Sequence, residues 1–407
     1  MSNLLEKYAE LAVKIGANVQ KDQIVFINST VDCAELTRLI VKKAYNAGAK
    51  SVIVNWADDA VTKMGYQYRS LETLSEVPDF LVERVKYITE VDSCVISIVS
   101  GSPDLLKDID PMKLQKANQA MSAKVDFYRT FMMKNSAQWT IVAYPSKEWA
   151  NKVFPNDKKS EEKLLKAILD GSRVKETNDP IKAWKEHIAA LAKNNKTLND
   201  YNFRKLNFKN SLGTELEVGL VEGHIWAGGG EKSIKGHDFA PNIPTEEAFT
   251  MPSKFMTQGK VVSTKPLSYN GNLIVDFFLE FKDGKVVNFG AKEGLETLKN
   301  LLEFDEGAKY IGEVALISHN SPISQSNVLF YNTLFDENAS CHLALGAAYP
   351  MNIKNGTMMS QDELIKKGYN ASKTHVDFMF GSACMEIMGT TSDGEKVQIF
   401  KNGNFIL

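Results

Sequence analysis

This chain of 407 residues has no large excess of positive or negative charge, no long apolar run and no closely paired cysteines. Each of these absences argues against a class of protein. Its 48 lysines and arginines nearly balance 50 acidic residues and form no basic block, which argues against nucleic acid as a partner. No apolar run approaches the length that crosses a bilayer, so we expect no membrane partner. The amino terminus has the pattern of an amphipathic helix and lacks the basic and apolar regions of a secretory signal. These absences predict a protein of the cytoplasm.

The four cysteines are isolated along the chain, and none forms a Cys-x-x-Cys pair. A disulfide framework or a cysteine-based zinc site would need closer or paired spacing. We therefore expect reduced, buried thiols at Cys33, Cys94, Cys341 and Cys384.

The first half of the chain alternates short, almost wholly apolar strands with amphipathic helices. This alternation indicates a parallel sheet that is covered by helices on both faces. We expect strands at residues 23–29, 51–56, 93–99 and 139–144, and helices at residues 4–15, 32–47, 113–134, 160–169 and 180–193.

The second half changes character from Tyr201 onward, where short extended segments alternate with turn signals such as Asp283-Gly284 and Asn402-Gly403. The length suggests two domains with ample room for a core. We place the boundary near residue 197. This gives an α/β domain with a mainly parallel sheet at residues 1–197 and a β-rich α+β domain at residues 198–407, which carries every candidate ligand described below.

A nucleotide site would need a glycine-rich turn after the first strand, so that the backbone can approach phosphate. The residues after Ser29 contain no such turn. Gly228-Gly-Gly230 lies in the β-rich half and lacks the Lys-Ser ending of a P-loop. We interpret the triplet as a turn or a close backbone contact and expect no nucleotide cofactor.

Two acidic positions stand in unusual surroundings. Glu246 and Glu247 lie between prolines that hold the backbone extended, which would fix a carboxylate on a loop, although such a pair is more often a solvated turn. Glu313 interrupts an apolar run at residues 310–317 that has the pattern of a buried strand. A buried carboxylate is costly unless a cation or hydrogen-bond donors neutralise it, and the alternative is an edge-strand glutamate that faces solvent.

Only six histidines occur, and two of them have suggestive neighbours. His375 and Asp377 share one face of a strand, so they could bind one metal, or the aspartate could orient the imidazole. His342 lies among small residues, with Glu337 before it and Tyr349 after it, where a lone histidine is usually a satisfied core residue. Two imidazoles with at least three carboxylates would be enough to hold a pair of divalent metals, a common way to activate water.

The remaining histidines have no recognisable site, and we predict that they are dispensable for catalysis. His187 lies on a helix rich in lysine and glutamate and is expected to face solvent. Cys341 adjoins His342, but neighbours in an extended chain point opposite ways, so a Cys/His nucleophile is the weaker interpretation. The other three histidines are His224, His237 and His319.

Four motifs in this order and at these separations resemble the M29 family of metallo-aminopeptidases. The resemblance extends over the whole chain, including the α/β first half. Ala248 departs from the β-branched residue expected there, which does not touch the chemistry. The motifs are Asn242-Ile-Pro-Thr-Glu-Glu-Ala-Phe-Thr250, Gly312-Glu-Val-Ala-Leu316, Glu337-Asn-Ala-Ser-Cys-His-Leu-Ala-Leu-Gly346 and His375-Val-Asp-Phe-Met-Phe-Gly381.

The resemblance implies two divalent metal ions per chain, whether zinc, cobalt or manganese, and a homodimer. Glu313 would be shared by both metals, Glu337 would bind or support them, and Tyr349 matches a tyrosine of the family's active site. Glu247 is preferred over Glu246 as the ligand. The implied metal ligands are Glu247, Glu313, Glu337, His342, His375 and Asp377.

We therefore expect a metal-dependent aminopeptidase that releases single residues from peptides with a free amino terminus. Water activated by two metals would attack the scissile carbonyl, with Glu313 or Glu337 as general base and Tyr349 as hydrogen-bond donor to the tetrahedral intermediate. One alternative is a metal hydrolase of another class, such as an amidase or phosphoesterase. The other is a non-enzymatic two-domain peptide-binding protein, which would hold no metal.

Overall fold

The computed structural model describes residues 2–269 and 271–407. These form two compact units: the first runs to Glu186 and includes Gly230–Pro244, and the second comprises His187–Gly229 with Thr245–Leu407. The division between Glu186 and His187 falls inside helix α9 (Pro180–Tyr201). The boundary expected near residue 197 lies in the same helix, and it stays a prediction because compactness alone does not show which segment folds independently.

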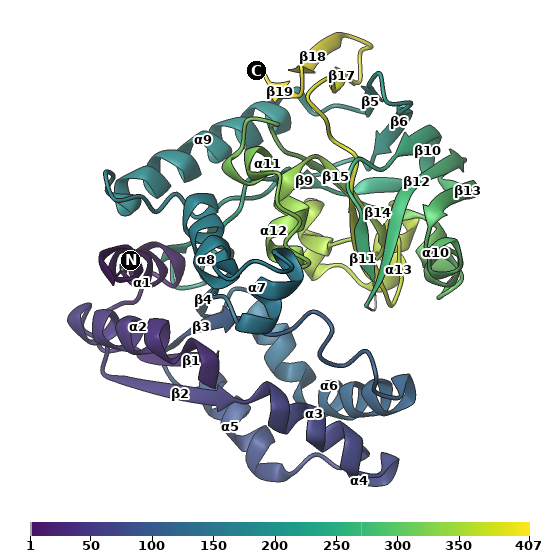
Figure 1. The fold of residues 1–407 in the computed structure, drawn as a ribbon. Helices are drawn as coiled ribbons and strands as arrows, with labels where there is room; N and C mark the ends of the chain where they lie inside the picture. The colour runs from purple at the N-terminus through teal and green to yellow at the C-terminus, as the bar shows by residue number, and fades with distance from the viewer. Residues whose placement is uncertain (1, 270) are drawn as a thin grey trace. The chain divides into compact units, whose positions relative to one another are not determined.

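The first unit is built on a parallel sheet with the strand order β2-β1-β3-β4. Its inner strands bury most of their apolar side chains, as a sheet covered on both faces requires. Helices α2 and α5 lie on opposite sides of this sheet (Figure 1). The elements are β1 (Ile24–Thr30), β2 (Ser51–Ala57), β3 (Ser93–Val99), β4 (Gln138–Ala143), α1 (Ser2–Leu11), α2 (Ala34–Asn46), α3 (Asp59–Tyr68), α4 (Leu71–Ser75), α5 (Asp79–Glu90), α6 (Pro111–Met133), α7 (Lys147–Val153) and α8 (Ser160–Gly171), with the short strands β7 (Glu231–Lys232) and β8 (Asp238–Phe239).

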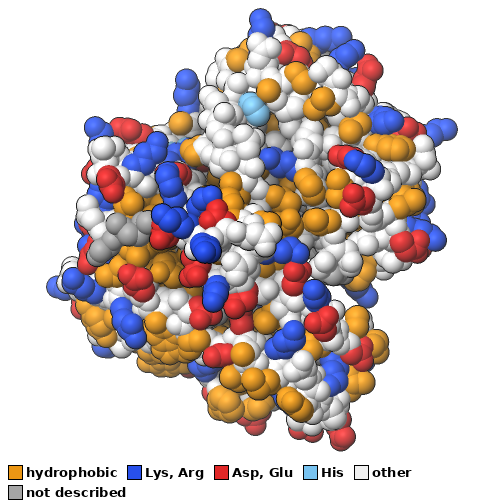
Figure 2. Space-filling view, in the orientation of Figure 1, with side chains coloured by type: hydrophobic (Ala, Val, Ile, Leu, Met, Phe, Trp, Pro, Cys, Tyr) orange, Lys and Arg blue, Asp and Glu red, His pale blue; other side chains and the backbone are white. Residues whose placement is uncertain are grey.

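The sequence analysis did not predict the helices α3, α4 and α5 between β2 and β3. Helix α3 has no buried residue, so its apolar side chains at Val61, Met64 and Tyr68 do not pack into a core. Val61, Met64 and Tyr68 of α3 are exposed, and hydrophobic side chains gather over this part of the unit in Figure 2.

The second unit contains two antiparallel sheets, which pack against each other through β10 and β14. In the described part of the chain, the larger sheet has nine strands in the order β11-β12-β10-β6-β5-β17-β18-β19, with β13 beside β12. Its strands are β5 (Lys205–Lys209), β6 (Glu215–Leu220), β10 (Pro252–Val262), β11 (Leu267–Tyr269), β12 (Asn272–Lys282), β13 (Lys285–Glu293), β17 (Glu386–Thr390), β18 (Lys396–Lys401) and β19 (Asn404–Phe405).

The small sheet, as we call the other one, has the order β16-β15-β14-β9. Aromatic pairs such as Phe277–Phe378 and Phe208–Phe380 join residues of the larger sheet to residues at or just beyond β16 in one apolar core. The strands are β9 (Ala248–Thr250), β14 (Ile311–Leu316), β15 (His342–Gly346) and β16 (His375–Met379), and the helices of this unit are α10 (Leu295–Leu302), α11 (Pro322–Ser326), α12 (Thr333–Asp336) and α13 (Gln361–Lys366), with 3₁₀ turns at Glu306–Lys309, Glu337–Ala339, Pro350–Asn352 and Gly356–Met358.

The predicted fold class is confirmed: a parallel α/β region comes first and a β-rich region follows. A search of the described residues finds no helix that is both long and apolar enough to cross a membrane. All four cysteines are free, but Cys384 is partly exposed, which corrects the expectation that every thiol is buried.

Candidate metal centre

The small sheet brings the candidate ligands onto one face. Glu313, Ala344 and Asp377 form one row across β14, β15 and β16. His342 and His375 lie two residues from Ala344 and Asp377 along their own strands, and side chains two residues apart share a face. Because Ala344 carries only a methyl group, no long side chain stands between the two carboxylates of the row.

Five side chains then meet above this face, and we call Glu247, Glu313, His342, His375 and Asp377 the cluster. The Nε2 atom of His342 lies 3.3 Å from Oε1 of Glu313, 3.5 Å from Oε2 of Glu247 and 3.9 Å from Oδ1 of Asp377. The Nε2 atom of His375 lies 3.4 Å from Oδ1 of Asp377 and 3.8 Å from Oε2 of Glu313. The two oxygens of Glu313 therefore face different imidazoles.

Backbone carbonyls fix both imidazoles. The Nδ1 atom of His342 lies 2.9 Å from the carbonyl oxygen of Glu337, and Nδ1 of His375 lies 2.7 Å from that of Ala347. Since a carbonyl oxygen can only accept, each Nδ1 carries a proton and donates it. Each Nε2 is then turned toward the carboxylates, which is the arrangement in which histidine binds a metal.

The residues fit a divalent metal on two observations. Glu247, Glu313 and His342 each offer a ligand atom, and these atoms lie within 4.8 Å of one another. The Oδ1 atom of Asp377 is buried and has no hydrogen-bond partner among the described residues. A buried carboxylate oxygen without a donor is costly, and a cation removes that cost. Carboxylate oxygen together with imidazole nitrogen is a donor set that first-row divalent ions accept.

The carboxylates of the cluster also make the site favourable for a cation. Burial raises the pKa of the Glu247 carboxyl to about 8, and the charges of Glu313 and Asp377 raise it too. Burial opposes protonation of His342, but the bond to Glu313 and the nearby carboxylates raise the pKa of this imidazole to about 10. Burial likewise opposes protonation of His375, and Asp377 raises its pKa to about 9. The carboxylates therefore draw positive charge into a buried site.

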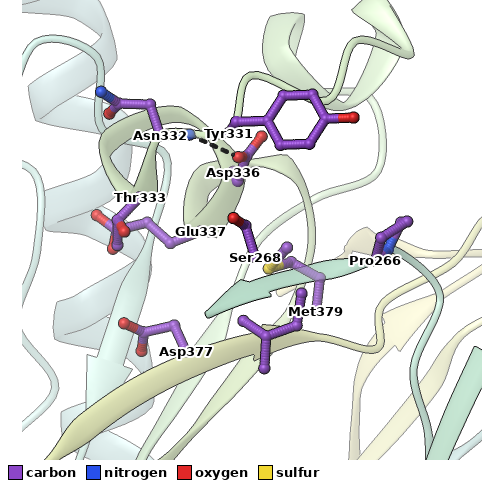
Figure 3. Close-up of a pocket in the computed structure, with 10 residues that line it drawn as sticks. Pro266, Ser268, Tyr331, Asn332, Thr333, Asp336, Glu337, Asp377 and Met379 are labelled. Carbon is purple, nitrogen blue, oxygen red and sulfur yellow. Dashed lines mark hydrogen bonds between the residues drawn. The ribbon is translucent and has the colours of Figure 1, made fainter. Parts of the chain in front are cut away.

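The other two predicted site residues lie beside the cluster. In the described structure Glu337 is not paired with either imidazole, and with Asp377 it lines a cavity (Figure 3). Burial and the charges of Glu247 and Asp377 raise the pKa of Glu337 well above its usual value. The ring centroid of Tyr349 lies 4.7 Å from that of His375, and burial and the nearby carboxylates raise the pKa of this phenol. The phenol therefore keeps its proton at neutral pH and can donate it.

Two side chains that the sequence analysis left out hold the loop before β9. Asn338 accepts the N–H of Glu246 at 2.7 Å and donates to the carbonyl of Leu334 at 3.0 Å, while fully buried. The Nε2 atom of His187 lies 2.7 Å from the carbonyl oxygen of Thr245. Its side chain is only 10% exposed, so the predicted solvent-facing position is wrong. The Lys/Glu pattern of α9 describes the outer face of that helix, whereas His187 lies toward the loop.

A close backbone contact beside Glu247 requires a glycine. A Cβ atom on Gly228, whose φ is +132°, would lie 2.2 Å from the carbonyl oxygen of Glu247, so glycine is required there. The glycine triplet therefore makes a close backbone contact.

The Cys341 thiol is buried beside another strand. Its Sγ atom lies 3.3 Å from the backbone nitrogen of Ile317, and burial raises the pKa of this thiol to about 12. A thiol nucleophile at this position finds no support in the geometry.

Comparison with known proteins leads to one family. Aminopeptidase 2 of Geobacillus stearothermophilus is 46% identical over 403 residues, which cover 98% of this chain and 97% of that protein. Aminopeptidase AmpS of Bacillus subtilis is 46% identical over 408 residues, which cover 99% of this chain and 98% of that protein. The structure of wild-type AmpT from Thermus thermophilus matches with a TM-score of 0.92 at 33% identity, and the match covers 100% of this chain and 99% of that one.

Residues 1–405 match the model of a family described as thermophilic metalloprotease (M29). This match spans nearly the whole chain, as do the matches to the relatives, and it confirms the resemblance carried by the four motifs. The alternative of a non-enzymatic binding protein is thereby set aside. The chain belongs to the M29 family of metalloproteases.

Proposed function

We propose that this protein is a metal-dependent aminopeptidase that removes single residues from peptides with a free amino terminus. One observation carries the proposal: both imidazoles are fixed through Nδ1 and present Nε2 to shared carboxylates, with the two oxygens of Glu313 facing different rings. Three relatives at 41–46% identity over almost the whole chain are themselves named aminopeptidases, which supports the same activity here.

Two divalent ions, of zinc, cobalt or manganese, are proposed as the cofactors. Glu247 and His342 would hold one ion and His375 and Asp377 the other, with Glu313 between them, because this is how the side chains pair. When bound, the ions would supply an activated water and polarise the scissile carbonyl.

The other side chains supply proton transfer and orientation. Glu337 is the nearby carboxylate that is not paired with an imidazole in the described structure. Its raised pKa makes its ionised form a stronger base, which would accept the proton of the attacking water and return it to the leaving amine. The Tyr349 phenol donates a hydrogen bond to the oxygen of the tetrahedral intermediate. The free α-amine of the peptide would bind in the same site, which makes cleavage stop after one residue.

Aminoacyl amides, matched N-acetylated amides and a phosphate monoester test this function on protein of known metal content. We expect hydrolysis of the free-amine substrates alone, its loss on chelation and its return with added divalent ion. Hydrolysis of the N-acetylated amides at an equal rate would indicate an amidase, and hydrolysis of the ester would indicate a phosphoesterase. Elemental analysis should find two divalent ions per chain, and one ion would contradict the paired site.

We also propose that the protein is a cytoplasmic homodimer, which rests on the family resemblance. Light scattering coupled to size-exclusion chromatography measures the mass directly. The chain mass is 45.3 kDa, so a stable particle of that mass would overturn the dimer.

A further inference from the structure

We propose that the cavity beside the cluster is the subsite for the side chain of the substrate's first residue, and that it takes side chains of small to medium size that are not acidic. This inference rests on the proposed aminopeptidase function. The cavity lies wholly within the second unit, between β11, β16 and the segment around α12. Its lining residues are Pro266, Leu267, Ser268, Tyr331, Asn332, Thr333, Asp336, Glu337, Asp377 and Met379.

Strand β16 makes the cavity continuous with the cluster. His375, Asp377 and Met379 alternate along this strand and therefore share a face. Met379 is also paired in register with His342, so it borders the cluster from two directions. Figure 3 shows the carboxylates of Glu337 and Asp377 at one side of the cavity, with Ser268, Met379 and Pro266 farther across it. A substrate whose reacting end meets the cluster has this cavity next to its first side chain.

The lining discriminates against negative charge. Three carboxylates and no lysine or arginine stand among the described lining residues, so an acidic side chain would be repelled. Asp336 accepts the N–H of Phe330 at 2.7 Å and that of Asn332 at 2.9 Å, so its carboxylate is held in place. Glu337 is not paired with an imidazole in the described structure, so the lining does not oppose a basic side chain.

The size of the cavity sets the upper limit. Its volume is about 70 Å³, which corresponds to roughly five water molecules at 10–15 Å³ each. A leucine or methionine side chain has about that number of atoms, whereas an indole exceeds it. The side chain of Met379 fills one wall and the hydroxyl of Ser268 another, so these two residues determine the accepted size.

Two variants change the cavity in opposite directions. Met379→Ala should widen it and raise the ratio of kcat/KM for tryptophan amide over leucine amide by roughly 10-fold or more, because a pocket distinguishes hydrophobic groups of different size by about 10–200-fold. Ser268→Phe should narrow it and lower kcat/KM for leucine amide by about 10-fold relative to alanine amide. Calorimetric binding of free leucine and free tryptophan to metal-loaded protein should show the same change in preference.

Met385→Ala is the matched control, since Met385 is a buried methionine of the same unit that does not line the cavity. It should change the rates for all amides by one common factor. Equal ratios in Met379→Ala and the wild type would overturn the subsite. If Met379→Ala fails to fold, Ser268→Phe alone decides the question, because it alters an exposed residue. Wild-type protein that holds metal but cleaves no amide would instead overturn the proposed function itself.

Discussion

Strands β3 and β14 lie in different units and are both largely buried, yet they carry different chemistry. In β3 the fully enclosed positions are occupied by apolar or small side chains, such as Val95 and Ile96. Strand β14 is buried along its whole length and still carries Glu313 at its centre. Burying a carboxylate costs several kcal/mol in free energy unless partners compensate. A sheet that only needs stability avoids that cost, so the buried charge in β14 supports the metal centre proposed there.

The largest expected effect comes from removing the charge that distinguishes β14. Glu313→Gln should lower kcat/KM by at least about 100-fold, because even residues that only orient metal ligands cost 10–100-fold. The purified variant should also lose bound metal while its circular dichroism stays native. Glu280→Gln makes the same chemical change on β12 of the same unit, at a side chain 38% exposed, and should leave the rate unchanged. Near-normal metal-dependent activity in Glu313→Gln would refute the role of this carboxylate.

Removal of the metal should affect the two units unequally. Ligand present at about 100 times its Kd stabilises the folded state by about 2.7 kcal/mol, and chelation withdraws this amount. We expect the amide hydrogens of β14 and β15 to exchange faster in chelated protein, while those of β1 and β3 keep their rates. Hydrogen exchange with mass spectrometry resolves the four strands. Equal acceleration in both sheets would contradict a site confined to the second unit.

A smaller effect is expected from the histidine that supports the loop before β9. His187→Ala removes the contact with the Thr245 carbonyl, two residues from Glu247, and should weaken metal affinity and kcat/KM by about 10-fold. This expectation revises the view that only two histidines matter. His237→Ala, in the first unit, serves as the control and should behave as wild type. If both variants keep full metal affinity, the loop does not depend on His187.

The smallest effect concerns stability and its pH dependence. Partial burial disfavours ionisation of Asp305, but the N–H groups of Lys373 and Ala308 and the hydroxyl of Ser372 lower its pKa. A lowered pKa in the folded state stabilises the protein above the unfolded value of about 3.9 and loses that contribution as the pH falls through the folded value. Asp305→Asn should therefore cost about 1 kcal/mol at pH 7, because hydrogen bonds to a charged group are worth about that much more than neutral ones, and much less near pH 3. Urea unfolding at the two pH values measures the difference, and an equal cost at both would exclude the carboxylate charge as its source.

The sequence predicts what local pattern encodes. Apolar runs located all four parallel strands of the first unit, including β2, which has no buried residue, unlike β1, β3 and β4. Helix α3 was not predicted although Val61, Met64 and Tyr68 follow a helical spacing, and in the structure this helix buries no residue. In the small sheet, the spacing of His375 and Asp377 gave their common face correctly, because alternation is a local property of a strand.

The parts that could not be predicted depend on contacts between distant segments. Asn338 and Glu246 are 92 residues apart in sequence and are joined by one buried hydrogen bond. His187 reaches Thr245 over 58 residues, and its polar neighbours on α9 concealed that it faces inward. The cavity likewise combines β11, α12 and β16, so no single motif reports its volume or its lining. A single sequence shows the composition of each segment but not which distant segments pair with one another.

The strands that pair in the small sheet are far apart in the sequence, so the site can form only when much of the second unit has folded. Strand β9 ends at Thr250 and pairs with β14, which begins only at Ile311, after four strands of the larger sheet have intervened. Pairings between such distant segments close late, because the intervening chain must first be ordered. The donor atoms therefore converge only when the second unit is nearly complete. A partly synthesised or unfolded chain has no assembled site, so an enzyme that cuts peptides becomes active only once its own chain is no longer an open peptide.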